Sequence, residues 1–235
     1  MISVIIPVRN MAGTITRAID SAIKAGCQDV IVVDDYSDDN SGTIAVSYPS
    51  PHVSVLRAMW GGVALGVCGA RNRGIQKARY DWILPLDADD ELLSDALHIF
   101  EQFTKPGHLI YTGYEDSDGS AALTTSGYHS PAPIGMITRK NVAYATFLFH
   151  REDWFRVGGY DPLFNIGGED WALMLALLNA GVAPIRVDQP IYRRHVEINA
   201  RTDRARTYWP TIMQLAREKY PTVFQEGAFA VQTHS

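Results

Sequence analysis

The sequence has few cysteines and no long apolar run, and each absence narrows what the protein can be. Only two cysteines, Cys27 and Cys68, occur among 235 residues, too few for a disulfide framework or a cysteine zinc site. No apolar run approaches the roughly 18 residues of a membrane span. No basic stretch followed by an apolar one marks a secretory signal. We therefore expect a cytoplasmic protein with reduced thiols. Peripheral binding to a membrane surface is an alternative that these absences leave open.

An excess of positive charge is also absent. The formal net charge is −5, so no global positive field favours nucleic acid, although a local basic patch stays open. The hydrophobic content of 46% and the charged content of 20% are ordinary for a soluble globular protein. A chain of this length can bury a sizeable core as one large or two small domains.

The first hundred residues alternate between strand and helix patterns. Strands are predicted at Ser3–Val8, Val30–Val33, Val53–Arg57 and Trp82–Leu86. Helices are predicted at Thr14–Lys24, Ile44–Tyr48, Ala70–Ala78 and Ala96–Phe103. This alternation indicates an α/β fold, a mostly parallel central sheet flanked by helices on both faces.

The pattern changes after a strand predicted at Leu109–Tyr114. The stretch 116–133 is rich in Ser, Gly, Thr and Pro, as functional or mobile segments are, and is a candidate lid. Further elements are predicted beyond it: strands at Tyr144–His150 and Ile185–Val187, and helices at Arg151–Val157, Asp170–Asn179 and Arg204–Lys219.

The segment Asp87-Ala88-Asp89-Asp90 follows the apolar run Trp82–Leu86 and is the most informative feature of the chain. Unpaired carboxylates cannot follow a buried strand into the core. They emerge at its carboxyl end, where open α/β sheets place ligands. In an extended segment Asp87 and Asp89 point the same way, and their mutual repulsion favours a hard divalent cation between them. Such a cation keeps open positions that phosphate oxygens usually fill.

Two other strand ends carry polar residues. Asp34-Asp35 ends the second strand, where a carboxylate can hydrogen-bond ribose hydroxyls or a base N–H group. Turn chemistry explains the same residues equally well. The pair Arg9-Asn10, after the first strand, leaves the same two alternatives open.

Two candidate sites lie where helices are predicted to begin. Arg71-Asn72-Arg73 follows a Gly-rich loop, and a helix N-terminus with arginine attracts phosphate, although a solvated helix face is the simpler reading. Glu169-Asp170 follows Gly167-Gly168, and its acids either complement the helix dipole or supply a general base. Neighbouring helical residues point about 100° apart, so only one of them can serve as base, and the spacing does not say which.

The segment Arg193-Arg194-His195 is a further candidate. The two arginines favour a site that faces a diphosphate. A lone histidine is more often a surface or core residue than a ligand, so metal ligation by His195 is the less favoured alternative.

Taken together, these residues resemble the inverting family 2 glycosyltransferases, which have the GT-A fold. The resemblance extends from Ser3 to about His195, and its strength is the order of its parts. These are Ser3–Asn10, Val33–Ser37, Ala70–Ile75, Leu86–Asp90, Gly158–Asp161 and Gly168–Trp171. One departure is Tyr36, where relatives often carry Gly or Asn.

The resemblance implies a single GT-A domain over 1–235. Its Rossmann-like nucleotide half would cover about 1–115 and its acceptor half about 116–235. It also implies a nucleotide-diphosphate sugar as donor, Mn²⁺ or Mg²⁺ as cofactor, and a glycan or other hydroxyl compound as acceptor, with nucleic acid as acceptor left open.

The resemblance also implies roles for single residues. The donor would be bound by Pro7, Val8, Arg9, Asp35, Arg71, Asp87, Ala88 and Arg194. The metal would be held by Asp89, Asp87 and His195, with Asp89 the direct ligand. Asp170 matches the base, with Glu169 as the alternative.

Two other functions are weighed against this hypothesis. A sugar-nucleotide nucleotidyltransferase shares the layered fold but carries a Gly-rich signature with Arg and Lys after the first strand, which Val8–Gly13 fits poorly. A non-catalytic module that binds nucleotide sugars would not need both the Asp87–Asp90 segment and Glu169-Asp170. The sequence therefore favours a metal-dependent inverting glycosyltransferase.

Overall fold

The structure is a computed structural model that describes residues 1–117, 128–129, 137–138, 146–195, 200–225 and 232–234. Its strands are β1 (Ile2–Val8), β2 (Val30–Asp34), β3 (Val53–Arg57), β4 (Met59–Trp60), β5 (Val63–Ala64), β6 (Trp82–Pro85), β7 (Glu91–Leu92), β8 (His108–Ser117), β9 (Tyr128–His129), β10 (Phe149–His150), β11 (Ala183–His195) and β12 (Gln232–His234). Its α-helices are α1 (Ile15–Lys24), α2 (Ser41–Val46), α3 (Gly66–Lys77), α4 (Ala96–Glu101), α6 (Arg151–Arg156), α7 (Glu169–Asn179) and α8 (Ala200–Lys219). Short 3₁₀ helices are η1 (Pro162–Phe164) and η2 (Pro221–Phe224).

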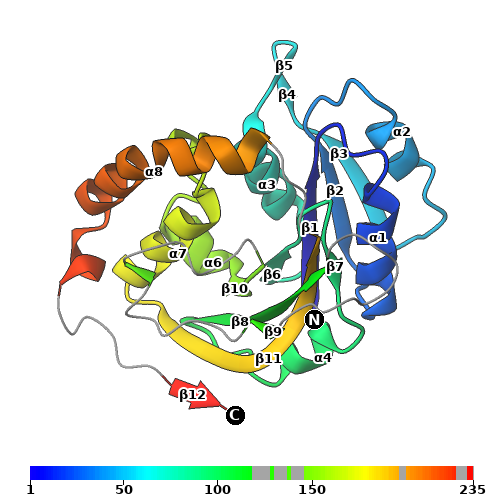
Figure 1. The fold of residues 1–235 in the computed structure, drawn as a ribbon. Helices are drawn as coiled ribbons and strands as arrows, with labels where there is room; N and C mark the ends of the chain where they lie inside the picture. Colours follow the sequence, from blue (N-terminus) through cyan, green and yellow to red (C-terminus); the bar gives the residue numbers. More distant parts are fainter. Residues whose placement is uncertain (118–127, 130–136, 139–145, 196–199, 226–231, 235) are drawn as a thin grey trace.

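The main sheet has the strand order β10-β6-β1-β2-β3. Strands β6, β1, β2 and β3 are parallel, and only β10 at the edge is antiparallel. Figure 1 shows α1 and α2 on one side of this sheet and α3, α6, α7 and α8 on the other. The expected α/β fold with a mostly parallel sheet flanked by helices is therefore confirmed.

Alternate residues of the central strands face two separate apolar cores. Ile5 of β1 and Val33 of β2 pack in the core that contains α3, α7 and α8. Val4 and Val32 pack in the core that contains α1, α4 and the strands β8 and β11. Because successive side chains of a strand point to opposite faces, a strand buried on both faces is apolar at nearly every position.

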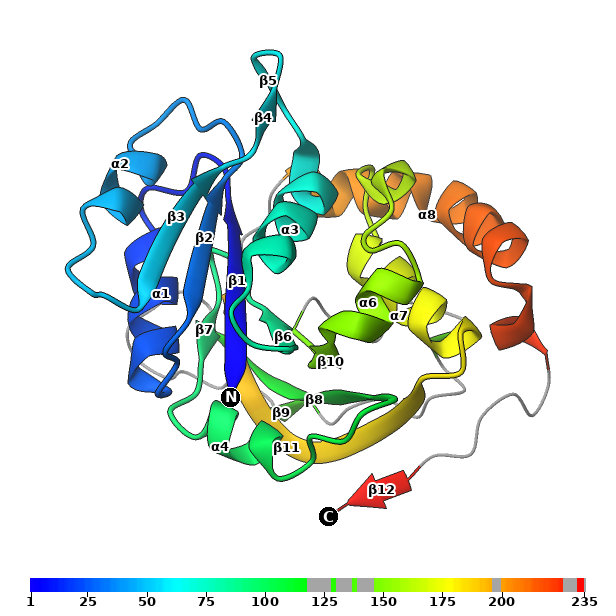
Figure 2. The same ribbon diagram turned by 180° about the vertical axis from the view of Figure 1, so that it is seen from behind.

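A second sheet lies across one end of the main sheet, with the order β12-β11-β8-β9, and β7 pairs with β11. Its long strands β8 and β11 run parallel, from the pair His108 and Ala183 to the pair Ser117 and His195. Figures 1 and 2 show these strands curving beside the main sheet, with β11 reaching towards β1 and β7. This second sheet brings the end of β11 to the segment that follows β6.

Several elements differ from the sequence-based expectation. Strand β11 covers 13 residues, far beyond Ile185–Val187, because backbone pairing with β8, β12 and β7 continues through the polar positions. In the Gly-rich loop expected before Arg71, Gly61-Gly62 form the turn of the tight β4–β5 hairpin, and both have positive φ, which glycine adopts without strain.

Part of the expected structure lies outside the described residues. This holds for most of the candidate lid 116–133 and for 144–145 of the strand predicted at Tyr144–His150. Of its described residues, only Phe149–His150 form the strand β10. Among the helices in the described part of the chain, none is long and apolar enough to cross a membrane.

Candidate active site

Three carboxylates meet at the carboxyl end of β6. The Leu86 N–H group still pairs with the Ile5 carbonyl, and the chain then turns because the Asp90 N–H group donates to the Asp87 carbonyl at 3.1 Å. One oxygen each of Asp87, Asp89 and Asp90 lies within 4.8 Å of the others. The turn replaces the expected extended geometry and adds Asp90 to the pair predicted from the sequence.

Asp90 is the buried member of this carboxylate cluster. Its side chain accepts a hydrogen bond from the His195 backbone N–H group at 3.0 Å. Burial, followed by the negative charges of Asp87 and Asp89, raises the pKa of the Asp90 carboxyl well above its ordinary value. A cation placed among the three groups would offset both effects, because an opposite charge favours the ionised form.

Arg71 of α3 connects the carboxylate cluster to the start of α7. Its side chain is fully buried and donates from Nη2 to Asp87 Oδ1 at 2.6 Å and from Nη1 to Glu169 Oε1 at 2.9 Å. The guanidinium carbon lies 5.2 Å from the centre of the Tyr160 ring. Burial lowers the pKa of Arg71, but Asp87, Tyr160 and Glu169 outweigh it and raise this pKa, so the buried guanidinium keeps its charge.

The position of Arg71 in its helix differs from the expectation. The sequence suggested that Arg71-Asn72-Arg73 opens a helix, but α3 begins at Gly66, so Arg71 lies in its second turn. Two N–H groups at the start of this helix already have partners: Asp35 Oδ1 accepts from the N-cap residue Leu65 at 2.7 Å, and Asn165 Oδ1 accepts from Cys68 at 3.1 Å. Arg71 therefore acts in this site through its guanidinium and not through the helix N-terminus.

Glu169 and Asp170 begin α7 and are both buried. Glu169 is held by Arg71, whereas Asp170 Oδ1 accepts the N–H group of Trp171 at 2.8 Å. Asp170 nevertheless contributes to the electrostatic field at Arg71 and Tyr160. Both carboxylates thus lie beside the guanidinium that contacts Asp87.

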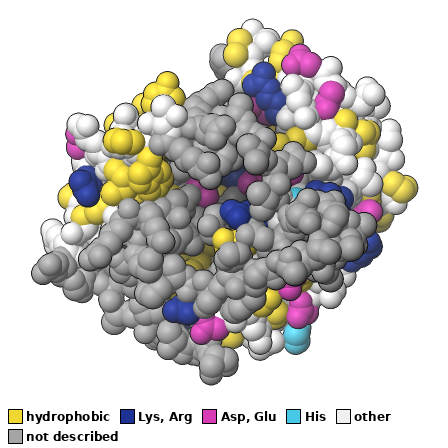
Figure 3. Space-filling view, in the orientation of Figure 1, with side chains coloured by type: hydrophobic (Ala, Val, Ile, Leu, Met, Phe, Trp, Pro, Cys, Tyr) yellow, Lys and Arg dark blue, Asp and Glu magenta, His cyan; other side chains and the backbone are white. Residues whose placement is uncertain are grey.

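The residues expected to bind the nucleoside lie at the carboxyl ends of β1 and β2. Pro7 and Val8 end β1 beside Asp34, Arg9 is exposed after them, and the Asp35 N–H group donates to the Val8 carbonyl at 2.8 Å. Asp35 is 3% exposed, and burial is the main cause that raises the pKa of its carboxyl. Figure 3 shows that charged side chains of both signs gather near the centre of one face of the molecule.

Tyr36, the departure from the family pattern, has a φ of 61°. Gly and Asn adopt this left-handed conformation readily, whereas a bulky aromatic residue there is uncommon. The backbone at Tyr36 therefore makes a turn that Gly or Asn would adopt more easily than tyrosine.

Arg194 and His195 at the end of β11 border the carboxylate cluster, because the charge of Arg194 acts on the Asp90 carboxyl and the His195 N–H group donates to it. The guanidinium carbon of Arg194 lies 4.9 Å from the centre of the Tyr114 ring. His195 Nε2 lies 2.6 Å from Glu91 Oε1, and His195 is not among the residues whose ligand atoms gather within 4.8 Å. Metal ligation by His195 stays a prediction.

Sequence reasoning missed three contributors to this region. Asp90 was noticed but given no role, and Arg17 and Glu91 were not considered. Asn72, a candidate already named from the sequence, holds Tyr160 beside Arg71: its side chain donates to the Tyr160 carbonyl at 2.7 Å and accepts from the Tyr160 N–H group at 2.8 Å. Asp90 could have been found because it is the third carboxylate of the segment Asp87-Ala88-Asp89-Asp90. Nothing in the sequence pattern indicated Arg17.

Known proteins resemble this chain in sequence. The chain is 37% identical over 102 residues to the succinoglycan biosynthesis protein ExoO of Rhizobium meliloti, covering 41% of this chain and 27% of that protein. It is 26% identical over 189 residues to the chondroitin synthase of Pasteurella multocida, covering 77% of this chain and 19% of that protein. It is 25% identical over 180 residues to a PGL/p-HBAD biosynthesis glycosyltransferase of Mycobacterium bovis, covering 73% and 67%. The chain thus spans about a quarter or less of the length of the first two relatives.

Solved structures share the fold. The S. aureus protein TarS (residues 1–349), in complex with UDP-GlcNAc, matches with a TM-score of 0.72 at 16% identity, over 96% of this chain and 70% of that chain. The mannosyltransferase PcManGT of Pyrobaculum calidifontis, in complex with GDP-Man and Mn²⁺, matches with a TM-score of 0.63 at 16% identity, over 94% and 61%. These likenesses show the GT-A fold.

The family model described as glycosyl transferase family 2 matches residues 3–152. This match covers β1 to the start of α6 and includes Arg71 and the carboxylate cluster. Because it covers more than half of the sequence, the chain belongs to glycosyl transferase family 2.

Proposed function

We propose that this chain transfers a sugar from a nucleotide-diphosphate sugar to an acceptor hydroxyl, with a divalent cation and with inversion at the anomeric carbon. The observation that carries the proposal is the contact of one buried guanidinium with both parts of the site. Arg71 binds Asp87 of the carboxylate cluster and Glu169 next to Asp170. The proposed cation site and the proposed base therefore flank the same positive charge.

The carboxylate cluster suits Mn²⁺ or Mg²⁺. Both ions take oxygen ligands, and Mg²⁺ in protein sites commonly binds one or two carboxylates together with substrate phosphates. Asp87, Asp89 and Asp90 offer such oxygens within 4.8 Å of one another. We assign Asp89 as a direct ligand, with Asp87 and His195 as further candidates. When bound, the cation would neutralise the leaving diphosphate as a Lewis acid.

Asp170 is the proposed base. Glu169 is occupied by its ion pair with Arg71, and breaking that pair would leave a buried charge with one partner fewer. Asp170, the next residue of α7, would take the proton of the acceptor hydroxyl. The oxygen would then attack the anomeric carbon from the face opposite the leaving diphosphate, which inverts the configuration.

The nucleoside would lie at the ends of β1 and β2. Asp35 is placed there with Pro7, Val8 and Arg9 beside it, and it can accept a hydrogen bond from a ribose hydroxyl or a base N–H group. Ala88 lies between the aspartates of the cluster, and Arg194 is the proposed contact of the diphosphate. The acceptor would be a glycan or another hydroxyl compound.

The test begins with a thermal-shift screen of nucleoside diphosphates with and without Mn²⁺. Calorimetry of the best nucleotide then compares the wild-type protein with Asp89→Asn. We expect Mn²⁺-dependent binding in the wild-type protein and its loss in the variant, because a negatively charged carboxylate ligand of the cation is replaced by a neutral amide.

Asp188→Asn is the matched control, since Asp188 is an exposed aspartate on β11 that pairs with Arg186. This control should bind like the wild-type protein. Nucleotide binding of equal affinity with and without Mn²⁺, or in Asp89→Asn, would contradict the proposed metal site. A transferred sugar whose anomeric configuration is retained in proton NMR spectra would contradict inversion.

A further inference from the structure

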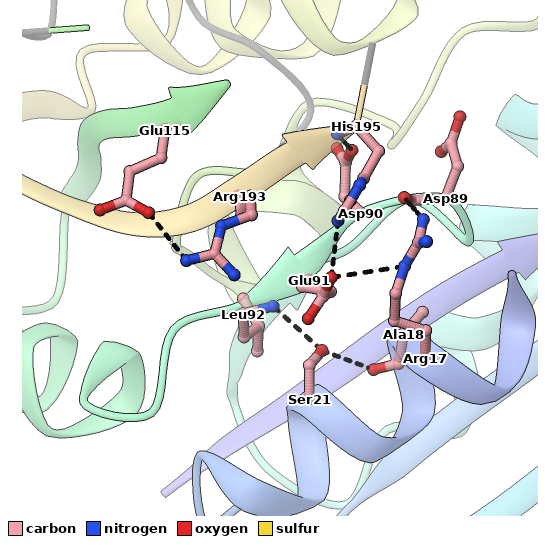
Figure 4. Close-up of polar contacts among 10 residues, drawn as sticks. All are labelled: Arg17, Ala18, Ser21, Asp89, Asp90, Glu91, Leu92, Glu115, Arg193 and His195. Atoms are coloured by element: carbon pink, nitrogen blue, oxygen red, sulfur yellow. Dashed lines mark hydrogen bonds and ion pairs between the residues drawn. The ribbon is translucent and has the colours of Figure 1, made fainter. Parts of the chain in front are cut away.

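The segment Asp89–Leu92 is held from two sides, by α1 and by the end of β11 (Figure 4). Strand β7 lies within this segment and pairs with β11 through Leu92 with Tyr192 and Glu91 with Arg193. The segment begins with a proposed cation ligand. Whatever holds its backbone therefore also sets where that ligand lies.

Helix α1 supplies two polar contacts to this segment. Arg17 Nη2 donates to the backbone carbonyl of Asp89 at 2.7 Å, and Arg17 Nε lies 3.4 Å from Glu91 Oε1. One turn further along, Ser21 Oγ accepts from the Leu92 N–H group at 3.0 Å. Figure 4 shows both side chains rising from α1 towards β7.

The end of β11 supplies the contacts on the other side. His195 Nε2 lies 2.6 Å from Glu91 Oε1, the same oxygen that faces Arg17 Nε. The backbone N–H group of His195 donates to Asp90 Oδ1. Glu91 therefore lies between a cation of α1 and the imidazole of β11.

This contact decides the tautomer of the imidazole. A carboxylate only accepts hydrogen bonds, so Nε2 must carry the proton, and Nδ1 of the neutral ring keeps its lone pair. The His195 side chain is 8% exposed, and among the described residues no group hydrogen-bonds its buried Nδ1. A histidine that ligates a metal almost always donates its other N–H group to a carboxylate or carbonyl in this way.

We propose that Arg17 and Glu91 are positioning residues of the cation site, Arg17 by holding the backbone of Asp89 and Glu91 by orienting the His195 imidazole. The inference rests on the proposed function. Neither residue would touch the cation. Loss of such supporting contacts typically weakens metal affinity by about 10–100-fold.

The first test compares Arg17→Met with Arg151→Met. Arg151 is a matched control, because it also donates to a backbone carbonyl, that of Ala78, and pairs with a carboxylate, that of Asp81. Both arginine side chains are 35% exposed, and Asp81 precedes β6 at the end opposite the carboxylate cluster. Mn²⁺ alone is titrated into each protein, residues 1–235, and free Mn²⁺ is measured by electron paramagnetic resonance. We expect about 10–100-fold weaker Mn²⁺ binding in Arg17→Met and wild-type affinity in Arg151→Met.

The second test reads the tautomer directly. In ¹⁵N-labelled protein the His195 ring signals, assigned by their loss in His195→Gln, should show Nε2 protonated and Nδ1 unprotonated. Glu91→Leu removes the acceptor and should abolish this preference and weaken Mn²⁺ binding. Glu91→Gln keeps an acceptor oxygen and should restore the preference. A role limited to stability would not follow this order.

The outcomes separate the two proposals. Wild-type protein that binds neither Mn²⁺ nor a nucleoside diphosphate overturns the proposed function. Wild-type protein that binds both, with Arg17→Met equal to Arg151→Met and an unchanged tautomer in Glu91→Leu, overturns only the positioning role. If Arg17→Met does not fold, Arg17→Lys replaces it, because lysine keeps the charge but lacks the two-pronged geometry.

Discussion

At the scale of single residues, the site depends on one buried charge. Arg71 is fully buried, and its guanidinium is compensated by Asp87, in the turn after β6, and by Glu169 of α7. A buried arginine is tolerated only when carboxylates and hydrogen bonds replace its water. The same ion pair separates the roles of Glu169 and Asp170, because one is committed to Arg71.

Substitutions of the two acids should therefore affect different properties, the catalytic rate for Asp170 and the stability for Glu169. Asp170→Asn should lower kcat about 10²–10⁴-fold, the usual contribution of a general base, and leave Mn²⁺-dependent nucleotide binding unchanged. Glu169→Leu should instead lower the free energy of unfolding by about 3 kcal/mol, the lower end for breaking a buried pair, since Arg71 keeps Asp87. Steady-state kinetics, calorimetry and urea denaturation measure the three quantities.

Asp153→Asn is the control for Asp170→Asn. Asp153 is also a buried aspartate in the first turn of a helix, but it pairs with Arg156 on α6. It should change kcat little. Full activity in Asp170→Asn together with inactivity of a folded Glu169→Gln would reverse our choice of base.

At the scale of elements, helix α3 positions Arg71, and Gly74 of this helix sets how closely the helix approaches the main sheet. A Cβ atom on Gly74 would lie 2.6 Å from Ile5 Cγ2 of β1 and 2.9 Å from Val33 Cγ2 of β2. Only a residue without a side chain therefore allows this helix to pack so near the strands. Arg71 lies three residues before Gly74 on the same helix. The close approach of this helix to the sheet therefore brings the Arg71 guanidinium to the carboxylate cluster.

We expect Gly74→Ala to be destabilising despite the higher helix propensity of alanine. Overpacking of a filled core typically costs about 1–3 kcal/mol, more than the roughly 1 kcal/mol that alanine gains over glycine in a helix. Urea denaturation measures the difference. Gly13→Ala is the control, because no atom lies within 4 Å of its added Cβ. Unchanged or raised stability in Gly74→Ala would show that α3 can shift without cost.

At the scale of the whole molecule, the two sheets tie the early and late parts of the chain together. Strand β8 pairs along its length with β11, and β6 pairs with β10. The core that contains α1 also contains Ile185 and Ile191 of β11. The division into a nucleotide half of 1–115 and an acceptor half of 116–235 thus stays a proposed division of function, and the single domain over 1–235 stays a proposal with it.

The expected consequence is that a fragment 1–115 does not fold by itself. It would expose the β8 edge, the β6 edge and the apolar residues that β11 and α7 cover, and such exposed edges and patches lead to aggregation. Far-UV circular dichroism and urea titration should show no cooperative transition for the fragment, whereas the full chain unfolds cooperatively. A sharp transition in the fragment would establish an independent nucleotide half.

The sequence by itself determined the architecture of the main sheet and the residues at its carboxyl edge. Short apolar runs between helix patterns, such as Val30–Val33, predict central strands buried on both faces, and the polar residues that follow them then lie at the edge of the sheet. Asp87, Asp89 and Asp35 could be placed in this way because their position depends only on where a strand ends. The ordered motifs then indicated the family.

Only the tertiary structure decided which of these residues meet. The contact of Arg71 with Glu169 joins positions 98 residues apart, and Arg17 reaches Asp89 across 72 residues. No local periodicity encodes such pairs, because they depend on how α1, α3 and α7 pack against the sheet. The length of β11 was hidden for the same reason: a strand that gains its hydrogen bonds from partners on both sides can carry polar residues that mask its pattern.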